Sequence, residues 1–273
     1  MKLEIIARLP AVDAGRTPLL FVPGMQHGAW CWDVHFLEYF ARHGYPSYAV
    51  SLRGHGDSEM RGRLRWTRIA DYVDDLASAV AQLPESPTLI GHSMGGFIIQ
   101  KYLEHHSAPG AVLLSSPGPA GMLATSLRVA RRRPLVFAKV SVSFSLLPLI
   151  ATPELAREAY FSEDLPYDDL LRYWSQMQDD SYLAFLDMVA LDLPKPEKVT
   201  TPMLVVGAGR DNMLSRGEME SSARAYHAPL AMIPDVAHNS MLEVRWQSVA
   251  DSILGWLQAR LSSSSRSLEP IEV

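Results

Sequence analysis

Short apolar runs alternate with segments of helical periodicity along most of the chain. Between two of these runs, near residues 67–83, apolar side chains recur every three or four positions, which predicts a helix with one buried face. Further helices are expected from Ser93 to about His105 and in a last segment that carries Val249 and Leu257. The apolar runs are too short for helices and are typical of buried strands: 18–22, 47–52, 87–91, 111–116, 202–207 and 230–234. This alternation predicts an α/β fold with helices on both faces of a mostly parallel central sheet.

The alternation stops between about residues 118 and 198, where no clear strand pattern appears. Residues 137–147 fit the period of a strand as well as that of a helix, and we favour a helix because a single strand there would have no partner. We therefore expect a helical cap insertion at 118–198, between the two parts of a core domain at 1–117 and 199–261. The serine-rich residues 262–273 have few apolar side chains that could pack, and they are predicted to form a disordered tail.

The composition of the 273 residues, 48% hydrophobic and 20% charged, is that of a globular protein with enough apolar side chains for a large core. The net charge of -5 disfavours a nucleic-acid-binding surface. Cys31 is the single cysteine, so no internal disulfide can form. No run supplies the roughly 20 apolar residues of a membrane span, and the first ten residues lack the pattern of a signal peptide. We therefore expect a cytoplasmic protein with no nucleic-acid partner and no membrane span, whose oligomeric state the sequence leaves open.

The segment TLIGHSMGGFII (88–99) places Ser93 between glycines, after one apolar run and before another. A strand that turns into a helix within so few residues forms a strained corner, which tolerates little but glycine beside it. The serine at the corner projects its hydroxyl from the sheet edge, which is the geometry of a nucleophile elbow. An ordinary turn has the same pattern, so the interpretation depends on partners elsewhere in the chain.

Two further polar residues follow predicted strands in the order that such a serine requires. A serine hydroxyl becomes a good nucleophile when a histidine, itself oriented by a carboxylate, takes its proton. Asp211 follows the strand at 202–207, and His238 lies in the loop after the strand at 230–234. Asp235 is an alternative acid, but only three residues separate it from His238, which limits how its carboxylate can face the imidazole. We therefore favour Asp211 as the orienting carboxylate.

A tetrahedral intermediate also needs hydrogen-bond donors for its oxyanion. One expected donor is the backbone N–H of Met94, at the start of the helix that follows the serine. The other is the backbone N–H of Met25 in FVPGMQHGAWCW (21–32), where Gly24 permits close backbone approach. The histidines and Cys31 show no metal-ligand spacing, and no nucleotide-binding glycine motif occurs. We therefore expect neither a metal nor another cofactor.

These motifs resemble those of the α/β-hydrolase fold superfamily along almost the entire chain. GHSMGG resembles the elbow, SLRGHGDS (51–58) a glycine-rich loop of the family, and AHNSMLE (237–243) its histidine loop. FVPGMQHGAWCW is similar to a segment of the plant methylesterase and hydroxynitrile lyase branch, and in that alignment Met25 falls on the oxyanion residue. Pro23 and Ser51 depart from the family pattern, where histidine and aspartate stand. Both departures affect loop shape more than the catalytic assignment.

The resemblance narrows the set of reactions that this chain is expected to catalyse. Serine at position 93 disfavours a haloalkane dehalogenase or an epoxide hydrolase, because both carry aspartate there. Asn239 stands where hydroxynitrile lyases have lysine. The resemblance implies a carboxylesterase-like enzyme that cleaves a small-molecule ester, lactone or thioester through an acyl-enzyme on Ser93. In this mechanism His238 is the general base and acid, and Asp211 orients the imidazole. A carbon–carbon bond hydrolase of a keto acid and a non-enzymatic ligand receptor on the same fold stay open as alternatives.

The insertion at 118–198 is expected to fold over the sheet edge that carries these residues. Some of its apolar residues are expected to line a pocket for a hydrophobic acyl or aryl group, with packing against the core as the alternative. The candidates are Phe137, Phe144, Leu147, Trp174 and Phe185. The arginines between Arg128 and Arg133 are expected to be mostly solvated, with at most one reaching an anionic substrate group.

Overall fold

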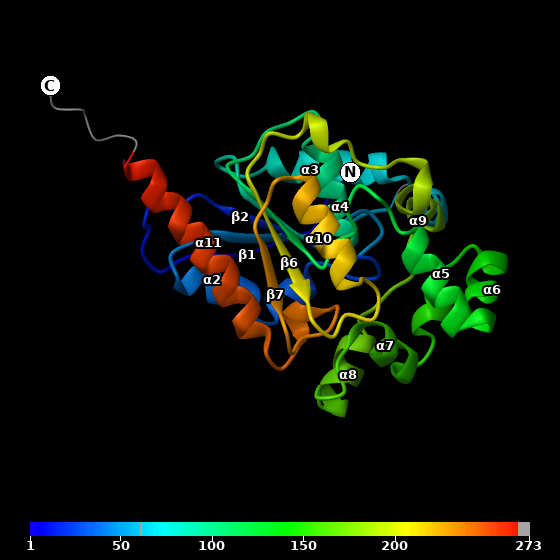
Figure 1. Cartoon of the computed structure of the whole chain (residues 1–273). Helices are drawn as coiled ribbons and strands as arrows, with labels where there is room; N and C mark the ends of the chain where they lie inside the picture. The colour runs from blue at the N-terminus through cyan, green and yellow to red at the C-terminus, as the bar shows by residue number, and fades with distance from the viewer. Residues whose placement is uncertain (61, 267–273) are drawn as a thin grey trace, which may run out of the picture.

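The central element of the computed structural model, which describes residues 1–60 and 62–266, is a seven-stranded sheet (Figure 1). Its strand order is β1-β3-β2-β4-β5-β6-β7, and every neighbouring pair is parallel except β1 and β3. The strands are β1 (Ile5–Arg8), β2 (Leu19–Val22), β3 (Ser47–Val50), β4 (Thr88–His92), β5 (Ala111–Leu114), β6 (Met203–Ala208) and β7 (Leu230–Ile233). All six predicted strands are confirmed, and β1 adds an antiparallel edge that the predicted set did not include.

Alternate side chains of each strand enter two different cores, because successive residues of a strand point to opposite faces. Leu19 and Phe21 of β2 pack against α2 (Phe36–Arg42) and α11 (Trp246–Arg266). Leu20 and Val22 pack against α3 (Ile69–Val80) and α4 (Met94–Tyr102), and α10 (Arg216–Ala225) lies on that same face. Helices therefore cover both faces of a mostly parallel sheet, as the sequence predicted.

Residues 115–202, which connect β5 to β6 and are all described, form helices and loops but no strand. Residues 118–198 of this segment are called the helical insertion below. Its elements are α5 (Leu123–Arg132), α6 (Pro134–Ser143), η2 (Leu147–Ile150), α7 (Pro153–Tyr160), α8 (Tyr167–Trp174), α9 (Tyr182–Leu186), the π-helical turn η3 (Asp187–Leu191) and η4 (Pro196–Lys198). Helix α6 covers residues 137–143 of the ambiguous apolar run; it ends at Ser143 because the backbone of Phe144 is left-handed, and Leu147 begins η2. The domain boundaries stay a prediction.

The remaining elements are short, apart from the last helix. They are α1 (Trp30–Asp33), η1 (Leu64–Trp66) and η5 (Ser240–Leu242). Helix α11 continues to Arg266, through the first part of the tail that was expected to be disordered. The rest of that tail, residues 267–273, lies outside the described residues. Among residues 1–60 and 62–266, no helix is both long and apolar enough to cross a membrane.

Candidate active site

Ser93 occupies the turn between β4 and α4, in a backbone conformation that few residues other than glycine adopt. Its φ is 47° and its ψ is -118°. The turn is held by close backbone packing: a Cβ on Gly95 would lie 2.3 Å from the carbonyl oxygen of Val22, at the end of β2. Such strain persists only where the surrounding structure fixes it, and it is concentrated at functional sites.

The structure brings Ser93, His238 and Asp211 into direct contact at the carboxyl ends of three strands. The Nε2 atom of His238 lies 3.0 Å from the Oγ of Ser93, and its Nδ1 atom lies 2.8 Å from Oδ2 of Asp211. The side chains of His238 and Asp211 are 3% and 2% exposed. A carboxylate facing Nδ1 keeps the imidazole proton on that nitrogen, so Nε2 is free to accept the serine proton.

The carboxylate of Asp211 is oriented by its own loop. Its Oδ1 atom accepts hydrogen bonds from the backbone N–H groups of Met213 and Leu214, at 2.8 and 2.9 Å, which leaves Oδ2 for His238. Asp235, the alternative acid, lies 3.1 Å from Arg210 and is 44% exposed. It makes no contact with His238 among the interactions of the described chain. The geometry therefore favours Asp211 over Asp235.

The two expected oxyanion donors lie beside Ser93. Met94 is the first residue of α4, so its N–H has no carbonyl partner within the helix. Met25 lines the same cavity as Ser93 and His238. Within the described part of the chain, no hydrogen bond uses the N–H of Met25 or of Met94. Both groups stay candidate donors.

Two neutral histidines hold the loops around the site. Burial lowers the pKa of His92 well below its usual value, and its Nε2 donates to the carbonyl of His238 at 2.9 Å. Burial also lowers the pKa of His27 to about 4; its Nδ1 donates to the carbonyl of Met25 at 2.7 Å, and its Nε2 accepts from Asn239 at 3.0 Å. Through these contacts both residues hold the backbone of the loops around Ser93.

A cavity of about 20 Å³ lies over Ser93 and His238. This volume holds about one water, so a larger molecule enters only when lining side chains move. Tyr160 closes one side: its ring stacks on His238 with centroids 5.6 Å apart, and its hydroxyl donates to Oε1 of Gln26 at 2.9 Å. Met122 and Met213 also line the cavity, and both have the flexible side chains that such movement requires. The sequence carried no signal for these three residues.

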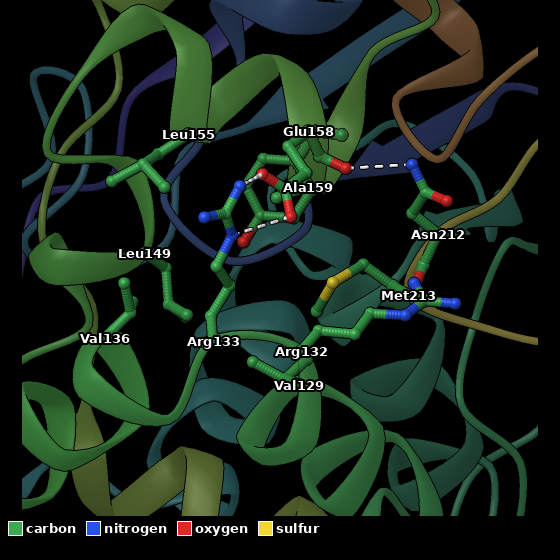
Figure 2. A pocket seen from close by; sticks show the side chains of 11 residues that line it. Val129, Arg132, Arg133, Val136, Leu149, Leu155, Glu158, Ala159, Asn212 and Met213 are labelled. Carbon is green, nitrogen blue, oxygen red and sulfur yellow. Dashed lines mark hydrogen bonds and ion pairs between the residues drawn. The ribbon is translucent and has the colours of Figure 1, made fainter.

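A second cavity of about 50 Å³ lies between the helical insertion and the loop that follows β6 (Figure 2). Tyr160 and Met213 line both cavities and form the wall between them. The rest of the lining is mostly apolar: Val129, Val136, Leu149, Leu155 and Ala159, with Arg132, Arg133, Glu158 and Asn212. In Figure 2 the guanidinium of Arg133 faces the carboxylate of Glu158 at one side of this space.

None of the five apolar residues expected to line a substrate pocket borders either cavity. Leu147 and Trp174 line a separate surface groove, and Phe144 packs against Trp66 and Tyr182. The second cavity is lined instead by smaller aliphatic side chains of the insertion. In the described part of the chain, no group of three or more His, Cys, Asp or Glu side chains is arranged to hold a metal ion.

Comparison with known proteins assigns the family. The model of the alpha/beta hydrolase family matches residues 19–252. Methylesterase 10 of Arabidopsis thaliana is 30% identical over 115 residues, which are 35% of this chain and 41% of that relative. The pFDCC methylesterase MES16 of the same plant is 24% identical over 214 residues, or 74% of this chain and 80% of that relative. A thermophilic esterase from Thermogutta terrifontis has a similar fold, with a TM-score of 0.69 at 18% identity over 94% of this chain and 93% of that one. The chain belongs to the alpha/beta hydrolase family.

Proposed function

We propose that this member of the alpha/beta hydrolase family cleaves carboxylic esters through an acyl-enzyme on Ser93. The observation that carries the proposal is the continuous chain of contacts from Ser93 Oγ through His238 to the anchored carboxylate of Asp211. The two plant relatives are named as methylesterases, which supports ester bonds as the bonds cleaved.

The mechanism follows from the roles that these contacts permit. His238 Nε2 takes the hydroxyl proton as Ser93 Oγ bonds to the ester carbonyl carbon, and the carbonyl oxygen becomes an oxyanion bound by the N–H groups of Met25 and Met94. The imidazolium, stabilised by Asp211, then gives its proton to the departing alcohol as the carbon–oxygen bond breaks. Water attacks the acyl-enzyme by the same route, and His238 returns the proton to Ser93. Lactones and thioesters follow the same steps.

The charge of the site favours esters over keto acids. The residues that line the Ser93 cavity include neither arginine nor lysine, so the carboxylate of a keto acid has no counter-charge there. Arg132 and Arg133 lie at the second cavity, where Arg133 is paired with Glu158. Carbon–carbon bond hydrolysis is therefore the less favoured hypothesis for the reaction.

The second cavity supports a more specific proposal, that an apolar alcohol portion of the ester is bound there. His238 must protonate the leaving oxygen, so the alcohol portion lies on the His238 side of the scissile bond. Tyr160 covers that side, and the second cavity begins behind Tyr160 and Met213. The helical insertion thereby acts as a cap that selects the substrate, and rotation of the Met213 side chain joins the two cavities.

The test is covalent labelling combined with turnover. A fluorophosphonate should add to Ser93, and Ser93→Ala should lose both the label and about 10⁴-fold or more in kcat for an alkyl ester. Mass spectrometry that places the adduct on another serine would contradict the proposed nucleophile. A burst of one product equivalent followed by no turnover would favour the ligand receptor, whereas steady turnover would favour the enzyme.

A further inference from the structure

Gln26, the residue after the proposed oxyanion donor Met25, is held in a strained conformation by the helical insertion. It is fully buried and has a φ of 67°, which is uncommon for a residue with a side chain. Its N–H and side-chain amide donate to Asp180 Oδ2 at 2.8 Å and to the carbonyl of Leu146 at 3.0 Å. Its carbonyl accepts from the N–H of Gln178 at 3.0 Å, and its Oε1 accepts from the hydroxyl of Tyr160 at 2.9 Å. All four partners belong to the insertion.

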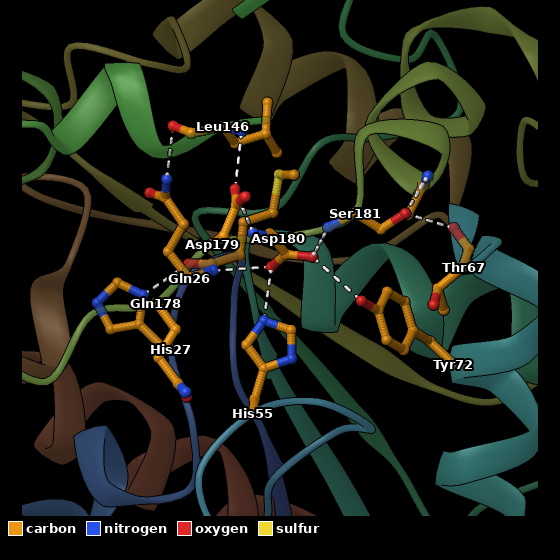
Figure 3. A network of polar contacts seen from close by, with 12 residues as sticks. Gln26, His27, His55, Thr67, Tyr72, Leu146, Gln178, Asp179, Asp180 and Ser181 are labelled. Atoms are coloured by element: carbon orange, nitrogen blue, oxygen red, sulfur yellow. Dashed lines mark hydrogen bonds and ion pairs between the residues drawn. The ribbon is translucent and has the colours of Figure 1, made fainter. Parts of the chain in front are cut away.

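Asp180 is the charged residue among the partners of Gln26 (Figure 3). Its fully buried carboxylate accepts from Gln26, from the hydroxyl of Tyr72 at 3.1 Å and from the N–H of Ser181 at 2.6 Å. It also lies 3.2 Å from Nε2 of His55. Burial by itself raises the pKa of Asp180, but the charge of His55 and the N–H donors outweigh burial and hold the pKa below its usual value. The carboxylate is therefore ionised, and both of its oxygens accept hydrogen bonds.

The peptide between Met25 and Gln26 is fixed at both ends. Its carbonyl accepts from Nδ1 of His27, and its N–H donates to Asp180. This peptide cannot rotate unless one of these contacts breaks, and its orientation restricts the backbone at Met25. We infer that Asp180 is a positioning residue, which rests on the proposed function: its carboxylate fixes the Met25–Gln26 peptide so that the Met25 N–H faces the oxyanion.

The competing explanation is that Asp180 only attaches the insertion to the core. The chain offers a matched control in Asp187, a second fully buried carboxylate of the insertion. Asp187 accepts from Nε of Arg68 at 2.8 Å and from the N–H of Ile69 at 3.0 Å, and so joins the insertion to the start of α3. It makes no contact with Met25 or Gln26 among the described interactions. A purely structural role predicts the same behaviour for Asp180→Asn and Asp187→Asn.

An asparagine cannot replace the Asp180 carboxylate. Both oxygens accept from N–H or O–H donors, so one donor group would face an amide NH₂ whichever way the side chain turned. When the NH₂ faces Gln26, the anchoring bond of the Met25–Gln26 peptide is lost. Because a displacement of about 1 Å at a reacting group costs on the order of 10²-fold, we expect kcat to fall about 10-fold to 100-fold in Asp180→Asn. KM should change less than about threefold, because the oxyanion forms only in the transition state.

The experiment measures kcat, KM and unfolding temperature for Asp180→Asn and Asp187→Asn in the full-length protein, and the affinity of each for a trifluoromethyl ketone. This probe forms a tetrahedral adduct with Ser93 and so reports on the oxyanion donors. We expect both variants to unfold at lower temperature, but only Asp180→Asn to lose ketone affinity in proportion to kcat. Equal kcat and ketone affinity in the two variants would overturn the inference.

The proposed function and this inference fail in different ways. If the wild-type protein shows no Ser93-dependent ester turnover, the proposed function is wrong. If the wild-type protein turns over and Asp180→Asn matches Asp187→Asn, only the positioning role is wrong. Asp180→Glu replaces Asp180→Asn if that variant does not fold, because glutamate keeps the charge beside His55 but carries its oxygens one methylene farther from its own backbone. Oδ2 of Asp180 is the acceptor of the Gln26 N–H, so an unchanged kcat in a folded Asp180→Glu protein would also overturn the inference.

Discussion

Replacing Asp211 by asparagine tests the proposed catalytic arrangement with almost no change in shape. Oδ1 of Asp211 accepts from the N–H groups of Met213 and Leu214, and Oδ2 faces Nδ1 of His238. In Asp211→Asn the amide oxygen keeps the two backbone hydrogen bonds, so the NH₂ group points at Nδ1. The imidazole then accepts at Nδ1 and carries its proton on Nε2, facing Ser93. It can no longer act as the base.

The size of the effect follows from the cost of reversing the amide. With the oxygen turned toward His238, the N–H groups of Met213 and Leu214 lose their acceptor, at about 1–3 kcal/mol each. The productive orientation is therefore disfavoured by about 2–6 kcal/mol, or roughly 30-fold to 10⁴-fold in population. Loss of the carboxylate charge beside the imidazolium adds to this, and a comparable substitution in a serine triad costs about 10⁴-fold. We expect kcat to fall by about 10⁴-fold.

The assay is steady-state hydrolysis of an alkyl ester together with thermal unfolding. Asp211→Asn should unfold within a few degrees of the wild type, because the two backbone hydrogen bonds persist. Asp235→Asn is the control: its carboxylate pairs with Arg210 at the surface, so kcat should change less than about threefold. A folded Asp211→Asn protein with more than a tenth of the wild-type kcat would refute the assignment, as would a larger loss in Asp235→Asn.

Three further predictions concern the backbone and the second cavity. Met25→Pro removes the proposed N–H donor and should lower kcat about 10²-fold to 10³-fold, whereas Met25→Ala should keep most activity; near-normal turnover in a folded proline variant would contradict the donor role. Ala159→Phe fills the second cavity and should lower kcat/KM for hexyl acetate about fourfold for each methylene that no longer binds, with methyl acetate as the unchanged reference. Equal losses for both acetates would count against an alcohol site. Gly95→Ala places a Cβ against the carbonyl of Val22 and should lower the free energy of unfolding by about 1–3 kcal/mol or more in urea titration; wild-type stability would show that the turn can relax.

The core of the candidate site was predictable because each of its residues follows a strand of the parallel sheet. Parallel strands end at one edge of a sheet, so the loops that carry Ser93, Asp211 and His238 lie at that edge. The choice between Asp211 and Asp235 depended on loop length, and the structure shows the same preference in its contacts. Local sequence signals were enough to select these residues, because the sheet brings their loops to one edge, while hydrogen bonds within the loops set the final geometry.

The insertion was not predictable at the level of side chains. Asp179 and Asp180 are adjacent and chemically identical in the sequence, yet Asp180 is fully buried against Gln26 while Asp179 binds the backbone N–H of Leu146. This difference depends on how several short helices pack, and no periodicity encodes it. The same holds for Tyr160, whose position over His238 depends on the end of α7. When residues of an irregular insertion close a site, they can be identified only from the tertiary structure.

Tyr160 links the cavity over Ser93 to the Met25–Gln26 peptide. The cavity over Ser93 has room for about one water, so substrate binding displaces a wall. Tyr160 cannot turn away without giving up its hydrogen bond to Gln26, which is part of the network that fixes the peptide beside Met25. Met213 has no such constraint on its side chain, although its backbone is held by Asp211. Under the proposed function, movement of the Met213 side chain opens the site toward the second cavity while the Met25–Gln26 peptide keeps its contacts, which favours esters whose alcohol portion is narrow and flexible.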